Sequence, residues 1–419
     1  MKPLLLTTLV ILLGFFSSAF GQGNSISFSE SSITPFVYSF EQEGDRFSGE
    51  GLQKLKAKLE GVQFVVLGET HGSARLSELT KTLLTDLQEQ DFRYFTLEVG
   101  PHSGELLNDF ARTPETTKAK LTGFSRKYYN THAEMYPIPF FEGEEDADFL
   151  SEAGRLGFEL WGLDQEFYTA TPHLMDQLYE NTPKNAALDQ LKKELDVVLD
   201  SAYYHDENTR GYSLEKQLPE EATVKQFFEA VAINAENEAI IQDIKKSWEI
   251  YRWNQERKPS HMSRVAYMRQ NFIRNYQKAK EKEAKPKVFL KTGRFHAGRM
   301  EQLDAYDLGN LVVELAEKEK TNSLHIGLLR GFYQREDGQL VNYWDRKKEY
   351  TEFSFDVFAQ KGQWILIDTQ QIREDWKAGK LSLPSDYSYH TTRKLLTNFD
   401  VLLIPPLDHA QTLLLEKGE

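Results

Sequence analysis

The chain has 419 residues, of which 40% are hydrophobic and 12% aromatic, a composition that supports a large packed core and excludes a disordered chain. The absence of cysteine excludes a disulfide scaffold, a thiol enzyme and a lipid anchor on an N-terminal cysteine. The formal net charge of -14, from 64 acidic and 50 basic residues, makes nucleic acid an unexpected partner.

The first residues have the pattern of a secretory signal peptide. Lys2 precedes an apolar run over residues 4–16, and the small-x-small tripeptide at 19–21 precedes an expected cleavage site near Gly21/Gln22. We therefore predict that residues 1–21 are removed and that the mature chain is periplasmic or secreted. Because no later stretch reaches the roughly 20 apolar residues that a membrane helix needs, no integral membrane segment is expected after cleavage.

Four segments share one pattern, a short β-branched or aromatic run that ends abruptly in glycine or polar residues. They are VQFVVLGETHG (62–72), FRYFTLEVG (92–100), GFELWGLDQE (157–166) and PKVFLKTGRFH (286–296). Near-continuous apolar runs of this length predict strands buried on both faces, as in a parallel sheet covered by helices. The first two flank residues 73–90, whose leucines recur at helical spacing, which predicts a right-handed βαβ unit.

The remaining segments predict a helical insertion and additional strands. Residues from about 169 to 285 are rich in Glu, Lys, Ala and Leu and include amphipathic helices at 227–254 and 263–282. Residues 126–145 are aromatic and interrupted by proline, which predicts an ordered loop. Later strands, some of them antiparallel, are expected at 309–316, 322–333, 363–369 and 400–406. The predicted fold class is α/β, with a mostly parallel central sheet flanked by helices and a large helical insertion.

Ionisable residues are concentrated where the four strand-like runs end. Parallel sheets bind ligands outside the carboxyl ends of their strands, so these ends are the expected site. They carry, in chain order, Glu69, His71, Glu98, Asp164, Gln165, Glu166, Arg294, His296 and Arg299. Two histidines with several carboxylates can act as a general base on water or hold a divalent metal that activates it.

The pattern Gly-x-x-His occurs twice, at 68–71 and at 293–296, and each copy directly follows a predicted strand. We expect the glycine to allow a sharp turn that brings the histidine back over the sheet edge. No Gly-x-Ser-x-Gly elbow is present, so direct attack by activated water is favoured over an acyl-enzyme. HExxH and phosphate-binding glycine loops are also absent, which argues against zincins and nucleotide-dependent enzymes.

Taken in order, these motifs closely resemble those of the erythromycin esterase-like proteins. The resemblance rests on GETHG after a strand, the strand end LEVG, WGLDQ, the helix RVAYMRQN (264–271) and LKTGRFHAGR (290–299). Paired Gly-x-x-His motifs with an intervening glutamate equally resemble the Tiki metalloprotease and ChaN haem-uptake branches. The likeness spans roughly residues 60–410, so residues 22–419 are expected to form one erythromycin esterase/ChaN-like α/β domain.

The resemblance implies a role for each matching residue. It makes His71 the general base on water, Glu98 its acidic partner and His296 the second essential histidine, with Glu69 as a further catalytic residue. From the residues alone, Glu69 can also simply cap the following helix. The residues expected to bind substrate or support the site, by ion pairs in the simplest case, are Asp164, Arg264, Arg299 and Arg75.

Three functions remain open at this point. The first is a hydrolase that cleaves an ester or amide bond of a small molecule or peptide with water activated by the His/Glu site. The second, ChaN-like, is an uptake protein that binds haem or another small ligand in the same cleft. The third is a Tiki-like protease in which His71, Glu98 and His296 hold a divalent metal such as Mn, Co or Zn.

Overall fold

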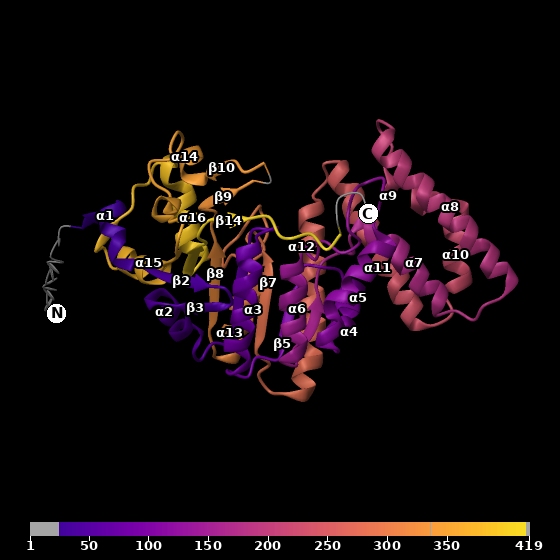
Figure 1. The fold of residues 1–419 in the computed structure, drawn as a ribbon, viewed down its shortest axis with the longest axis horizontal. Helices are drawn as coiled ribbons and strands as arrows, with labels where there is room; N and C mark the ends of the chain where they lie inside the picture. Colours follow the sequence, from indigo (N-terminus) through magenta and orange to yellow (C-terminus); the bar gives the residue numbers. More distant parts are fainter. Residues whose placement is uncertain (1–24, 336, 416–419) are drawn as a thin grey trace, which may run out of the picture.

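The computed structural model describes residues 25–335 and 337–415, and the predicted signal peptide lies outside them. Its centre is a nine-stranded sheet (Figure 1). The strands are, in spatial order, β3 (Arg46–Ser48), β2 (Val37–Glu43), β11 (Trp364–Ile367), β13 (Val401–Ile404), β8 (Ser323–Leu328), β4 (Phe64–Glu69), β7 (Val288–Gly293), β5 (Tyr94–Leu97) and β6 (Glu159–Gly162). Pairing is parallel from β13 to β6 and antiparallel from β3 to β13. The predicted α/β class with a mostly parallel sheet is confirmed.

Helices cover both faces of the sheet, because each central strand is apolar on both sides. On β4, Val65 and Leu67 belong to one hydrophobic core, while Phe64 and Val66 belong to the other. Five helices pack in the first core, α2 (Glu50–Leu59), α3 (Ala74–Gln88), α4 (Pro101–Ala111), α5 (Thr117–Tyr128) and α6 (Glu144–Arg155). The second core contains α12 (Ser260–Lys282), α13 (Leu308–Glu319), α15 (Thr369–Lys377) and α16 (His390–Asn398).

The predicted helical insertion is confirmed between β6 and β7. Its elements before α12 are α7 (Thr171–Glu180), α8 (Ala186–Asn208), α9 (Leu214–Gln217), α10 (Ala222–Val231) and α11 (Ala235–Gln255). Together they enclose a third hydrophobic core that includes Leu195, Phe227 and Trp248. Figure 1 shows this helical lobe at the right, beside the sheet, with α12 running back along the sheet.

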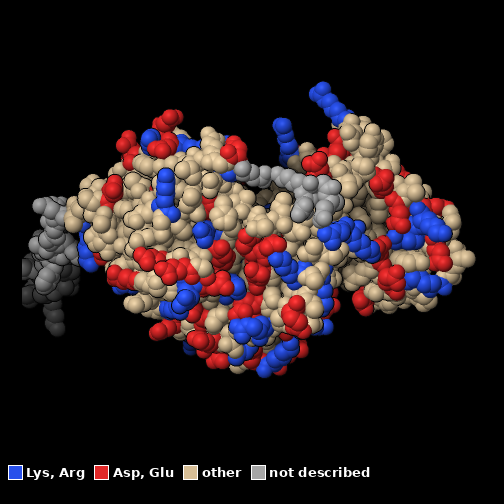
Figure 2. Space-filling model, viewed as in Figure 1, with Lys and Arg blue, Asp and Glu red and all other residues tan. Residues whose placement is uncertain are grey.

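Several short α-helices and strands lie outside the central sheet and the helices that cover it. They are α1 (Glu30–Ile33), α14 (Tyr343–Lys347), the paired strands β1 (Ile26–Ser27) and β12 (Leu381–Ser382), and the three-stranded sheet of β10 (Leu340–Asn342), β9 (Phe332–Gln334) and β14 (Asp408–His409). No helix in the described ranges is long and apolar enough to cross a membrane. Acidic and basic side chains are interspersed over the face drawn in Figure 2.

The predicted strand at 309–316 is wrong, because these residues lie inside α13. The Asp307 side chain accepts a hydrogen bond from the Leu308 N–H and caps this helix. Its buried residues, Leu308, Leu311, Val312 and Ala316 among them, recur at helical spacing. The predicted loop at 126–145 is also shorter than expected, since α5 continues to Tyr128 and α6 begins at Glu144.

Candidate functional site

The two Gly-x-x-His motifs leave the sheet from neighbouring strands. β4 and β7 pair in parallel register from Phe64 opposite Val288 to Glu69 opposite Gly293, so both motifs emerge at the same carboxyl edge. The glycines do not provide the predicted sharp turn, because Gly68 and Gly293 lie within extended strands and have no positive φ. They provide space instead. A Cβ on Gly293 would lie 3.1 Å from Glu98 Oε2 and 3.2 Å from His71 Nε2, so its absence lets both groups approach the strand end.

Glu98, which follows β5, is the centre of the site. Its Oε2 accepts hydrogen bonds from the Thr292 hydroxyl, at 2.9 Å, and from the Gly293 N–H. Its Oε1 accepts a hydrogen bond of 2.8 Å from Arg264 Nη2 and lies 3.4 Å from His296 Nε2. Burial alone would raise the pKa of Glu98, but His296, Arg264, His71 and the Gly293 N–H lower it to about 2. Glu98 is therefore a carboxylate at neutral pH.

His71 lies at the open side of this cluster. Its Nδ1 is 3.3 Å from Glu69 Oε1, and its side chain is 41% exposed. The imidazole stacks on the Phe140 ring with centroids 3.9 Å apart and planes 13° apart. The loop before α6 therefore fixes the orientation of His71, because the stack and Glu69 together restrain the ring plane and its Nδ1 edge.

Glu69 connects His71 to a buried charge network under the sheet edge. Lys291, on β7, donates a hydrogen bond to Glu69 Oε2, and both side chains are only 5% exposed. Burial would raise the pKa of Glu69, but the Lys291 ammonium and His71 hold it below its ordinary value. Deeper still, burial raises the pKa of Asp146 to about 7, although Lys291 opposes the rise. Glu69 is thus an ion-pair partner, while the side chain that caps α3 is Ser73.

His296 is held from both sides of its ring. Its Nδ1 is 2.7 Å from Asp307 Oδ2, and its Nε2 faces Glu98. Burial lowers the pKa of His296, but the Glu98 and Asp307 carboxylates outweigh burial and raise it above its ordinary value. A second imidazole, His261 at the start of α12, lies with its ring centroid 6.0 Å from that of His296. His261 Nε2 is buried and has no hydrogen-bond partner among the described residues.

Arg264 and Asp164 form a supporting ion pair beside Glu98. Arg264 Nε donates to Asp164 Oδ1 at 2.9 Å, and Arg264 Nη2 bonds both Asp164 and Glu98. Desolvation would lower the pKa of Arg264, but the Asp164 and Glu98 carboxylates raise it. This geometry connects the first turns of α12 to the ends of β5 and β6. Asp164 and Arg264 therefore support the site by an ion pair, one of the roles expected from the sequence.

Two of the predicted residues are not brought to the cluster. Arg75 pairs with Glu78 on its own helix at 3.0 Å, and its guanidinium Nε donates to the Leu407 carbonyl. Arg299 binds Asp400 and the Ser323 carbonyl, at the starts of β13 and β8, which is the opposite end of the parallel strands. The chain turns back after His296, so residues close to it in sequence move away from the carboxyl edge.

Among solved structures, the chain is similar to an erythromycin esterase. EreC in its open conformation superposes with a TM-score of 0.53 and 15% identity, over 91% of this chain and 100% of EreC. The chain has the erythromycin esterase fold. A succinoglycan biosynthesis protein has a TM-score of 0.50 and 18% identity, over 91% of this chain and 97% of that one. Haem-binding ChaN of Campylobacter jejuni has a TM-score of 0.32 and 12% identity, over 70% of this chain and 91% of ChaN.

These likenesses show the fold alone, and the ChaN likeness is too weak to support the haem-binding alternative. No family model matches the sequence, and no curated protein matches it. The sequence-based expectation of an erythromycin esterase-like architecture is therefore confirmed by its structure, while activity has to be argued from the site itself.

The group best placed to hold a metal differs from the predicted one. Ligand atoms of Glu69, His71 and Glu98 all lie within 4.8 Å of one another. Two carboxylates and one imidazole form a donor set suitable for Mn or Zn. His296 was predicted as the third ligand, but the ligand atoms that lie within 4.8 Å of one another are those of Glu69, His71 and Glu98, and His296 Nε2 faces Glu98 Oε1 at 3.4 Å.

Several residues of the site were missed by sequence reasoning. Lys291 and Thr292 lie inside an otherwise apolar strand, where a lysine is the one signal that a buried acid must be nearby. Phe140 belongs to the aromatic loop that was expected to be ordered, but nothing in the sequence indicates that its ring stacks on His71. Asp307 and His261 have no motif, so only the folded chain places them near His296.

Outside the site, His102 holds the helical lobe to the sheet domain. Its Nε2 lies 3.0 Å from Asp243 Oδ2 on α11, and its Nδ1 lies 3.6 Å from Glu105. Burial opposes protonation, yet the Asp243 and Glu105 carboxylates raise the pKa of His102 to about 10. His102, which follows the LEVG strand end in sequence, lies at the contact between α4 and α11.

This contact predicts a pH-dependent stability. Because the pKa of His102 is raised in the folded chain from 6.5 to about 10, its stabilisation is complete below pH 6.5 and is lost as the pH rises toward 10. His102→Gln should therefore lower the thermal unfolding midpoint strongly at pH 6 and much less at pH 10. His132→Gln is the matched control, since His132 pairs with Asp200 at 3.0 Å at the surface. An equal loss at both pH values would contradict the charged pair.

Proposed function

We propose that the mature chain is an exported hydrolase that uses water, activated at the His/Glu site, to cleave an ester or amide bond of a small molecule or peptide. The observation that carries this proposal is the convergence of His71 and His296 on Glu98 at the carboxyl edge of the sheet. Parallel sheets bind their ligands at this edge. EreC, which shares this fold, is an erythromycin esterase, so esters are the first substrates to test.

His71 is the residue suited to take a proton from water. It is the exposed member of the cluster, and its Nε2 faces the Gly293 strand end while Glu69 lies at its Nδ1. A proton accepted at Nε2 creates an imidazolium, which the Glu69 and Glu98 carboxylates stabilise. The orienting partner of His71 is therefore Glu69, rather than Glu98 as the sequence led us to expect.

His296 and Arg264 supply positive charge on the other side of Glu98. Both contact Glu98 Oε1, and both have pKa values raised by neighbouring carboxylates, so both remain protonated over a wider pH range. Fixed cations of this kind stabilise the oxyanion that forms when water attacks a carbonyl. His296, oriented through Nδ1 by Asp307, is the positioned donor in this scheme.

The test of this function is turnover. The mature protein should hydrolyse members of a panel of p-nitrophenyl esters of increasing chain length above the buffer rate. His296→Ala should lower that rate by about a hundredfold to a thousandfold, in the range found when an oxyanion donor is removed. A rate equal to buffer for every ester and for a parallel panel of peptide amides would refute the hydrolase.

A metal-dependent form of the same activity is the second candidate, favoured by the proximity of Glu69, His71 and Glu98. These residues would hold the ion, and a divalent metal there lowers the pKa of bound water and polarises a carbonyl. After chelator treatment, Mn, Co or Zn should bind at one equivalent by calorimetry, and Glu69→Gln should weaken binding by about tenfold or more. Glu78→Gln, at an acid outside the cluster, is the control. Absence of binding by all three ions would exclude this form.

A further inference from the structure

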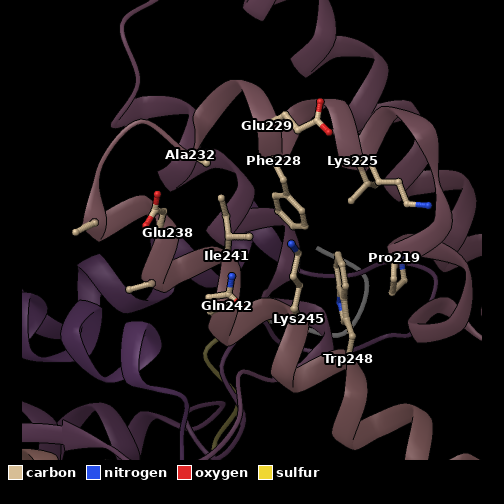
Figure 3. Close-up of a pocket in the computed structure, with 13 residues that line it drawn as sticks. Pro219, Lys225, Phe228, Glu229, Ala232, Glu238, Ile241, Gln242, Lys245 and Trp248 are labelled. Carbon is tan, nitrogen blue, oxygen red and sulfur yellow. The ribbon is translucent and has the colours of Figure 1, made fainter.

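The helical lobe contains a hollow that the catalytic proposal does not use. It lies between α10 and α11 and has a volume of about 680 Å³, within the range of small-molecule sites. Figure 3 shows Phe228, Ile241 and Trp248 along its base and Lys245 projecting between them. The hollow exists because facing positions at its rim, Ala232 and Ala239 among them, carry side chains too small to fill it.

The base of the hollow is apolar and closely packed. Phe228 is 6% exposed and Trp248 is 2% exposed, and their ring centroids are 6.0 Å apart. Ile241 is equally buried beside them. Side chains packed this tightly are pre-formed, so an apolar ligand placed on them loses water without a large cost of ordering the protein.

Two polar groups of the lining have no polar partner among the described residues. Trp248 Nε1 is buried and has no hydrogen-bond partner among the described residues, and leaving such a donor unpaired is unfavourable. Lys245 Nζ lies 5.3 Å from the centroid of the Phe228 ring and forms no ion pair with a described residue. By contrast, Lys225 on the opposite rim is held by Glu220 at 2.8 Å.

We propose that this hollow binds an apolar monoanion, such as a carboxylate or sulfonate with an aromatic or aliphatic body. The body packs on Phe228, Ile241 and Trp248, while the anionic group lies near the Lys245 ammonium. Glu229 and Glu238 on the rim disfavour ligands of higher negative charge. The site is separate from His71 and does not depend on the hydrolytic activity.

Two fluorescent probes test the proposal with the full mature protein. 8-Anilinonaphthalene-1-sulfonate is an apolar monoanion, and N-phenyl-1-naphthylamine has the same rings without the charge. Lys245→Gln should weaken binding of the sulfonate by about tenfold, as expected for loss of a charge-assisted contact, and leave the neutral amine unchanged. Lys246→Gln is the matched control, because Lys246 is the next residue on α11, does not line the hollow and pairs with Glu249 at 2.6 Å.

A second variant tests the location. Ala239→Leu extends a side chain into the hollow from an exposed helical position, so it should weaken both probes without changing the unfolding midpoint. Equal sulfonate affinities in the wild type and Lys245→Gln would overturn the proposal, as would probe binding that Ala239→Leu leaves intact. Should Ala239→Leu fail to fold, the comparison of Lys245→Gln with Lys246→Gln still decides.

Discussion

His71→Ala is expected to lower ester hydrolysis by about 10² to 10⁴-fold, the contribution typical of a positioned general base. The fold should survive, because the imidazole is 41% exposed and contacts chiefly Glu69 and Phe140. Initial rates with the best p-nitrophenyl ester, together with the thermal unfolding midpoint, measure both effects. The loss should appear in kcat/KM, since the residue acts on water rather than on substrate binding.

His390→Ala is the matched control for this experiment. His390 also stacks on an aromatic ring, Tyr387, with centroids 5.4 Å apart and planes 7° apart, but it lies outside the site. It should keep the wild-type rate. Full activity of His71→Ala would remove His71 from the mechanism, and an equal loss in both variants would indicate a structural effect of removing a stacked histidine.

The sheet and the convergence of the two motifs could be predicted from the sequence for a clear physical reason. Strands buried on both faces must be apolar throughout, so β4, β5, β6 and β7 are recognised by their runs and by the polar residues at which they stop. Parallel pairing then places those stops at one edge. This reasoning predicted from the sequence alone that Glu98 and His296 lie close together. The structure places them in contact, although they are more than 190 residues apart in the chain.

Other features depend on contacts that no local pattern records. The segment at 309–316 has the β-branched content of a strand, but its capping aspartate and the helical spacing of its buried residues decide for a helix. Arg299 follows His296 by three positions, yet the chain folds back and pairs it with Asp400. The function of the two motif glycines was also assigned to a turn, whereas the fold uses them for close approach.

Lys291→Met is expected to destabilise the protein by about 3–5 kcal/mol, the cost of breaking a buried ion pair by removing one partner. Lys291 and Glu69 are both 5% exposed, so the Glu69 carboxylate would remain buried without its cation. Urea unfolding at pH 7 measures the loss. Lys287→Met is the control, because Lys287 also lies over a phenylalanine, Phe92 at 5.6 Å, but bonds only the Gln90 carbonyl. Lys287→Met should lower the free energy of unfolding by no more than about 1 kcal/mol.

The cause of this loss can be separated from a simple packing defect. If the unpaired charge is responsible, Lys291→Met/Glu69→Gln should recover much of the stability, since no buried carboxylate is then left without a partner. The pair contributes stability that is present above the ordinary carboxyl pKa of 4.5 and declines as the pH falls through the lowered pKa of Glu69. The difference between wild type and Lys291→Met should therefore shrink in acid. A double variant as unstable as Lys291→Met, with a pH-independent difference, would show instead that the Lys291 ammonium stabilises the strand through its cation–π contact with Phe149, whose ring centroid lies 5.1 Å away.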